Sequence, residues 1–374
     1  MTFLTTLVSG YPYLCLLFAF SLGAIIGSFL NVCIYRLPRE KSIFWPGSRC
    51  GSCLQPIRWY DNIPLVSYWR LGGKCRTCGA AYSSRYFWIE FLTGVCFAGL
   101  FWLEVVHNIR SAGVLPFVMP SPTLPGELVV IWLYHAVFVS FLIVCTFTDF
   151  DLQEIPWTVT VPGTLVGVLG GTIWPWPWPM SAEVVPAAPH WEAVRAAGWD
   201  ALGVELSRLP IGLQPWPVWI PVPAWMAPGT WPLGLITALV GAAVGSGLIR
   251  LIRFVFTWGL GKEAMGLGDA DLMMMIGAFL GWQAPFVVLV FAVFLGLLYA
   301  IVLIVRYSGS ELPFGPFLAG GAVLTMLTPW WWHAMLAGVF FNFPLLVALS
   351  LAFSVLAFVF AMLMRMLRLI AQAA

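Results

Sequence analysis

The sequence predicts an all-α polytopic membrane protein, a bundle of about 8–9 transmembrane helices with a small cytoplasmic loop domain. The first observation behind this fold class is composition: of 374 residues, 61% are hydrophobic and only 9% are charged. The second is the mean hydropathy of +0.91. Too few polar side chains are available to cover a water-soluble globule of this size. The third is that the apolar residues gather in runs separated by short polar links.

The distribution of charge predicts the orientation of the first span. The formal net charge is only +2, which gives no case for a nucleic-acid partner. Nine of the 18 Lys and Arg nevertheless lie between Arg36 and Arg85, and the positive-inside rule places such a segment in the cytoplasm. No Lys or Arg precedes Arg36, so the basic region of a secretory signal peptide is missing, and we expect the first apolar stretch to remain as an anchor.

Each long apolar run is a candidate span, and successive spans alternate in direction. Counted from the cytoplasmic loop, this alternation brings Asp149 and Asp269 to the cytoplasmic face. The predicted spans are residues 11–35, 87–106, 128–148, 155–174, 233–256, 272–282, 285–305, 316–328 and 345–364. The predicted divisions are a first transmembrane helix (1–35), a cytoplasmic domain (36–85), helices carrying Asp149 (86–174), an extracytoplasmic insertion (175–231), a core carrying Asp269 (232–330) and an additional C-terminal helix (331–374). The insertion holds 11 prolines, a composition that breaks helices.

The loop domain contains two CxxC pairs. Cys50 and Cys53 are separated by 21 residues from Cys75 and Cys78. Each pair can chelate from one turn, and two such turns close on one zinc ion in a tetrahedral thiolate site. The alternative is a redox-active or disulfide-bonded set, which the reducing cytoplasm disfavours. The other cysteines, Cys15, Cys33, Cys96 and Cys145, lie in apolar spans and are interpreted as small packing residues.

Two acidic residues stand where spans end. Asp269 follows two glycines in the run Met265 to Asp269, and Asp149 ends the third predicted span. A carboxylate at a membrane boundary is costly to bury, so it is more often functional than structural. Two carboxylates held close together share one proton, and one can act as general base on water while the other acts as general acid. This pairing predicts aspartic protease chemistry.

Several motifs in order resemble the type IV prepilin peptidase family, over roughly residues 10–174 and 232–330. They are Gly27 to Val32, Ser48 to Cys50, Trp59 to Pro64, Cys75 to Gly79, Ser84 to Tyr86, Glu90 to Gly94, Asp149 with Pro156, Gly266 to Asp269, and Pro313 to Phe317. The resemblance implies cleavage of the basic leader from prepilins and pseudopilins at the cytoplasmic face of the bacterial inner membrane. It also implies methylation of the new N-terminal amine from S-adenosylmethionine, with Asp149 and Asp269 as the catalytic acids.

Four further expectations concern polar residues near these motifs. The six-residue spacing to Pro156 matches the family at Asp149 rather than Asp151. Asp271 stands where the family usually has Lys, and we expect it to cap a helix that starts near Leu272. Glu90 is expected either to pair with Arg85 or to belong to the methyl-transfer site. Ser28 and Asn31 are expected to form hydrogen bonds between helices. The family pattern also differs at Trp157 and Phe87.

Two rival functions remain open. One is a prepilin-type peptidase that does not methylate. The other is a transporter that uses paired carboxylates as a proton relay, against which the CxxC loop and the lack of a detectable internal repeat both argue. The partners expected for the favoured function are prepilin or pseudopilin substrates and the lipid bilayer.

Overall fold

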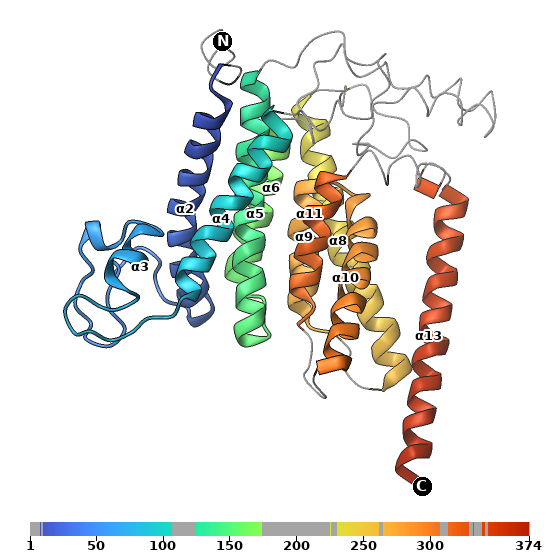
Figure 1. The fold of residues 1–374 in the computed structure, drawn as a ribbon. Coiled ribbons are helices and arrows are strands. Elements are labelled where there is room, and N and C mark those ends of the chain that lie inside the picture. Colours follow the sequence, from blue (N-terminus) through green and yellow to red (C-terminus); the bar gives the residue numbers. More distant parts are fainter. Residues whose placement is uncertain are drawn as a thin grey trace. The chain divides into compact units, whose positions relative to one another are not determined.

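A computed structural model of the chain describes residues 8, 10–106, 125–173, 225, 230–261, 265–306, 313–328, 332, 339–340 and 343–373 (Figure 1). The described residues form helices, turns and two isolated β-bridges, with no strand among them. The chain divides into two compact units, one made of residues 1–109 and 121–159 and the other of residues 110–120 and 160–374. Nearly all of the predicted insertion at 175–231 lies outside the described residues.

Each predicted apolar segment is helical over most of its described residues, which confirms the all-α membrane fold class. The first unit holds α2 (Pro12–Arg36), α3 (Val66–Leu71), α4 (Arg85–Phe101) and α5 (Pro125–Leu152), with short helical turns at Leu37–Arg39, Trp59–Asp61 and Trp102–Val106. The second unit holds most of α6 (Trp157–Ile173), then α8 (Trp231–Leu260), α9 (Leu267–Leu280), α10 (Ala284–Arg306), α11 (Gly315–Leu327) and α13 (Phe343–Ala373). Among the described residues, six helices are long and apolar enough to cross a membrane.

Small residues let α2 and α4 pack closely in the first unit. Gly23 and Gly27 form a GxxxG pair on α2, and a Cβ atom at Gly27 would lie 2.8 Å from the Cα atom of Glu90. The Asn31 side-chain amide, one turn further along α2, donates to the carbonyl of Tyr86 at 3.2 Å. This bond confirms the interhelical role predicted for Asn31. Since α4 begins at Arg85, the contact also fixes where the chain re-enters the bundle after the loop.

A buried polar pair joins α5 to the π-helical turn that follows α4. Glu104 lies in the π-helical turn Trp102–Val106, and its carboxylate is hydrogen-bonded to Nδ1 of His135 on α5. Both side chains are buried. Nearby, the Trp132 indole donates to the carbonyl of Phe97 at 2.9 Å. Polar contacts of this kind hold helices together where lipid removes the hydrophobic drive for association.

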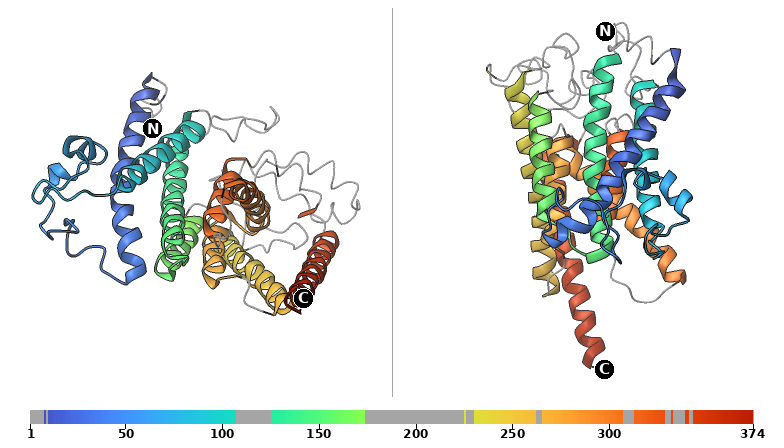
Figure 2. Two further views of the ribbon diagram at one scale, coloured as in Figure 1. Left: turned by 60° about the horizontal axis from the view of Figure 1, so that its bottom comes forward. Right: turned by 90° about the vertical axis from the view of Figure 1, so that its left-hand side faces the viewer.

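In the second unit, α8 and α9 approach closely enough for their backbones to touch. Gly241 of α8 faces Gly277 of α9, and a Cβ atom built on Gly241 would lie 2.1 Å from the carbonyl oxygen of Gly277. Met273 and Met275 of α9 are fully buried and pack in the core of this unit. The helix α13 packs against α8 near Gly259 and is otherwise largely exposed, as a lipid-facing helix should be (Figures 1 and 2).

Candidate metal centre and candidate catalytic acids

The four loop cysteines form one cluster. Their Sγ atoms all lie within 4.8 Å of one another, and the Sγ atoms of Cys50 and Cys78 are 3.8 Å apart. A tetrahedral zinc site with Zn–S bonds of about 2.3 Å has sulfur atoms about 3.8 Å apart. Cys50, Cys53, Cys75 and Cys78 therefore fit a closed thiolate site and could hold a metal ion. Among the described residues, this is the metal-ligand cluster that the structure brings together.

The two CxxC turns have the same backbone hydrogen bonds. The N–H of Cys50 donates to the carbonyl of Gln55 at 3.0 Å, and the N–H of Cys75 donates to that of Ala80 at 2.9 Å. The N–H groups of Cys53 and Ser52 point at the Cys50 thiol and lower its pKa to about 6. Donors aimed at sulfur favour the thiolate, which is the form that binds metal.

One position breaks the equivalence of the two turns. Leu54 and Gly79 follow the second cysteine of each pair, and both have positive φ, 58° and 70°. A non-glycine residue in this region costs about 1–2 kcal/mol. We expect Leu54→Gly to stabilise the loop by about 1 kcal/mol, because the Leu54 side chain is exposed and little packing is lost. Gly79→Ala should have the opposite sign. Hydrogen exchange of the loop amides measures both, and slower exchange in Gly79→Ala would contradict the assignment.

An ion pair ties the second CxxC turn to the rest of the loop. Arg76, between Cys75 and Cys78, donates from Nε and Nη2 to the two carboxylate oxygens of Asp61, at 2.7 and 2.6 Å. Hydrogen bonding to Arg76 lowers the pKa of Asp61. A bidentate pair of this geometry orients both partners. It holds the turn Trp59–Asp61 against the cysteine cluster.

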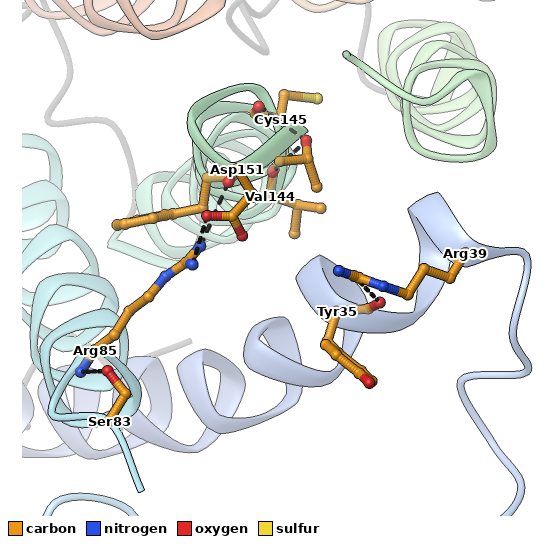
Figure 3. Close-up of polar contacts among 9 residues, drawn as sticks. Tyr35, Arg39, Ser83, Arg85, Val144, Cys145 and Asp151 are labelled. Carbon is orange, nitrogen blue, oxygen red and sulfur yellow. Dashed lines mark hydrogen bonds and ion pairs between the residues drawn. The ribbon is translucent and has the colours of Figure 1, made fainter. Parts of the chain in front are cut away.

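Asp149 lies in the last turn of α5 and is buried, with only 5% of its surface exposed. Two residues further, Asp151 accepts a hydrogen bond from Arg85 Nη1 at 2.6 Å (Figure 3). The Arg85 guanidinium also stacks over the ring of Phe147, 5.2 Å from its centroid. Arg85 is the first residue of α4 and directly follows the cysteine loop. Its contacts with Asp151 and Phe147 therefore place the end of α5, with Asp149, on the side of the first unit where the loop lies.

Of the two alternatives predicted for Glu90, the charge pair with Arg85 is wrong. Arg85 pairs with Asp151, and Glu90 instead accepts a hydrogen bond from the backbone N–H of Leu65 at 2.8 Å and contacts the Ser28 hydroxyl. Glu90 lies five residues after Arg85, about 140° around α4, and its side chain points towards α2 and the loop. Five-residue spacing already disfavours an Arg85–Glu90 pair on one helix, but the true partner could not be read from sequence because it comes from α5.

Asp269 lies in the first turn of α9 and is partly exposed. The helix begins at Leu267 with Gly266 as its N-cap residue, so the capping role predicted for Asp271 is wrong. Asp271 falls in the second turn, where backbone N–H groups already bond within the helix. Its carboxylate instead lies 3.6 Å from Arg250 on α8. The sequence prediction started the helix about one turn too late, because Gly268 was assigned to the preceding link.

A cavity of about 270 Å³ opens between α2 and the loop. Its polar lining includes Ser28, Arg36 and Asn62. Arg36 donates to the carbonyl groups of Ser42 and Gly47, which hold its guanidinium at the cavity wall. Because Ser28 also contacts Glu90, the cavity offers one cation and a carboxylate behind it.

These features define a polytopic α-helical membrane protein with a four-cysteine loop between its first two spans and carboxylates at the ends of two helices. A family described as "Bacterial Peptidase A24 N-terminal domain" matches residues 21–103, and one described as "Type IV leader peptidase family" matches residues 208–301. The first range contains the four cysteines and the second contains Asp269. Asp149 lies between the two ranges.

Several relatives carry the name "Prepilin leader peptidase/N-methyltransferase". The one from Dickeya chrysanthemi is 31% identical over 353 residues, 86% of this chain and 96% of the relative. The one from Pectobacterium carotovorum subsp. carotovorum is 30% identical over 333 residues, 82% of this chain and 90% of the relative. The match to the Myxococcus xanthus (strain DK1622) protein, 32% identical over 275 residues, spans 74% of this chain but only 59% of that relative. No solved structure matches. The chain belongs to the type IV leader peptidase family.

Proposed function

We propose that this chain is a membrane aspartic endopeptidase that removes the leader of type IV prepilins or pseudopilins and then methylates the new N-terminal amine. The observation that carries the proposal is its identity of about 30% to named prepilin leader peptidase/N-methyltransferases over nearly their whole length. The reaction takes place at the cytoplasmic face of the bacterial inner membrane. The four-cysteine loop and the end of α5 that bears Asp149 lie together in the first unit, which supports a shared face.

Asp149 and Asp269 are the proposed catalytic acids. One carboxylate takes a proton from water, and the resulting hydroxide attacks the scissile carbonyl. The other, protonated, gives its proton to the leaving amine as the peptide bond breaks. Asp151 and Asp271 lie two residues away on the same helices, and each has an arginine partner. Those ion pairs argue against Asp151 and Asp271 as the acids that transfer protons.

The loop is proposed to hold one structural zinc ion and to support methyl transfer. When bound, zinc cross-links the two CxxC turns and supplies no proton transfer. The methyl donor implied by the names of the relatives is S-adenosylmethionine, whose carboxylate suits the Arg36 guanidinium at the cavity between α2 and the loop. Glu90 contacts Ser28, which lines the same cavity, and is the proposed acceptor of the proton from the substrate ammonium.

Incubation of the purified protein with a prepilin tests the proposal. Intact-mass spectrometry should show loss of the leader, and one methyl group should be gained only when S-adenosylmethionine is added. Cleavage without methylation would remove the methyltransferase half of the proposal. A leader that stays attached would overturn the peptidase and leave the proton-relay transporter as the better account.

Loss of one metal ligand should empty the loop site. We expect Cys53→Ser to release the zinc ion, because a closed structural site has no spare ligand. Elemental analysis of protein purified without chelators measures the zinc content, and we expect one zinc ion per chain in the parent protein. The matched control is Cys96→Ser on α4, outside the cluster, which should keep its zinc. Equal zinc content in the two variants would contradict the assignment. Methylation should fall further than cleavage, since both proposed acids lie outside the loop.

A further inference from the structure

The helix α3 is held against the first turns of α4. Its N-cap residue Leu65 donates a backbone hydrogen bond to Glu90 at 2.8 Å. Two aromatic side chains of α3 then rest on Phe87: the ring centroids are 5.5 Å apart for Tyr68 and 6.0 Å apart for Trp69. These contacts hold α3 level with the first two turns of α4, which is a candidate membrane span.

The outer face of α3 is apolar and exposed. Val66 and Trp69 stand three residues apart, so they share one face of the helix, and they are 57% and 76% exposed. Ser67 is buried and Tyr68 packs inward against Tyr82, which assigns the opposite face to the loop interior. Val66 and Trp69 therefore form a small exposed apolar patch on this six-residue helix.

This exposed face continues into the lipid-facing stripe of α4. From Trp69 the aromatic contacts pass through Phe87 to Trp88 at 5.4 Å, and from Trp88 to Phe91 at 6.0 Å. Trp88 and Phe91 are themselves exposed on a helix long and apolar enough to span the membrane. Trp is favoured where hydrocarbon meets headgroups. The loop also extends sideways from the ends of α2 and α4, rather than onward along their axes (Figures 1 and 2).

The charge on the loop matches an anionic surface. Residues 36–85 contain nine Lys and Arg against two acids, Glu40 and Asp61. Asp61 is engaged by Arg76, and no described acid forms an ion pair with Arg58 or Arg70. Both arginines lie within 6 Å of the Tyr60 ring, at 5.8 and 5.9 Å from its centroid, and Arg70 is adjacent to Trp69. Arg70 beside the exposed Trp69, with Arg58 on the same Tyr60 ring, suits a phosphate group above acyl chains.

We propose that α3 docks in the headgroup layer and binds anionic phospholipid, with Val66 and Trp69 at the acyl boundary and Arg58 and Arg70 on the phosphate. The surface anchors the loop parallel to the membrane, independently of the metal and of the proposed acids. It therefore stands whether or not the proposed peptidase activity is found.

The test uses a photo-crosslinking residue in the full chain. p-Benzoylphenylalanine replaces Trp69 in one variant and, as a matched control, Trp59 in another; Trp59 is 80% exposed in the same loop, and its aromatic contact is with Tyr60. Each variant is reconstituted into vesicles containing phosphatidylglycerol or only phosphatidylcholine, illuminated and analysed by peptide mass spectrometry. Gel filtration confirms that each variant remains folded.

We expect lipid adducts at position 69 several times more often than at 59, and more often with phosphatidylglycerol. Arg58→Gln and Arg70→Gln should each reduce the preference for phosphatidylglycerol by about fivefold, as expected for one charge at an anionic surface. Equal lipid labelling at 69 and 59, the absence of any preference for the anionic lipid, or adducts at 69 to another segment of the protein or to a second copy would each overturn the proposal.

Discussion

Asp269→Asn is expected to lower leader cleavage by about 10³-fold or more, and Asp149→Asn should do the same. A neutral amide can neither take a proton from water nor hold the proton that the pair shares, so either replacement removes both roles at once. Single-turnover cleavage of a prepilin by the purified variants measures the loss. A variant that cleaves within tenfold of the parent would remove that residue from the catalytic pair.

The matched controls are the neighbouring acids. Asp151→Asn and Asp271→Asn should each retain most of the activity, because these carboxylates form ion pairs with Arg85 and Arg250. Both pairs are partly exposed, so their loss should also change stability little. Loss of cleavage in Asp151→Asn with Asp149→Asn still active would move the catalytic role by two residues.

Gly241→Ala is expected to destabilise the second unit by about 3 kcal/mol. A methyl group there would meet the Gly277 carbonyl at 2.1 Å, so α8 and α9 would have to separate, and α9 carries Asp269. Cleavage should fall with stability. The control on the same helix is Gly247→Ala, whose methyl group meets nothing within 4 Å. It should be neutral or stabilising by up to about 1 kcal/mol, since Ala favours helix.

Unfolding in increasing denaturing detergent compares the two variants. The close backbone contact predicts changes of opposite sign in stability, because Gly241 faces a neighbouring helix and Gly247 does not. Equal stability of Gly241→Ala and Gly247→Ala would show that α8 and α9 do not pack as described.

Sequence alone predicted the features that depend on local pattern. Apolar runs predicted the helices because every spanning segment must satisfy its own backbone hydrogen bonds within the membrane. The spacing of Cys50, Cys53, Cys75 and Cys78 predicted their cluster because each CxxC pair closes within one turn. Asn31 was predicted to bond between helices because a polar amide in a span needs a partner.

The features that sequence missed depend on contacts between distant segments. The partner of Arg85 is Asp151, 66 residues away on α5, rather than Glu90 on its own helix. Glu104 and His135 meet across two helices, with no spacing that could have paired them in advance. For Asp271 the error was local: Gly268 suggested a link, whereas α9 begins at Leu267 with Gly266 as its N-cap residue.

We propose that Asp149 and Asp269 act together as one catalytic pair. The most direct measurement bridges Asp149→Cys to Asp269→Cys in membranes with dibromobimane, which fluoresces only after joining two thiols. A specific protease site introduced within 175–231 then separates the two halves of any chain that is not bridged. We expect the two halves to stay joined after proteolysis, in higher yield than for the control pair Asp151→Cys with Asp269→Cys. Halves that separate freely, or a better yield from position 151, would contradict it.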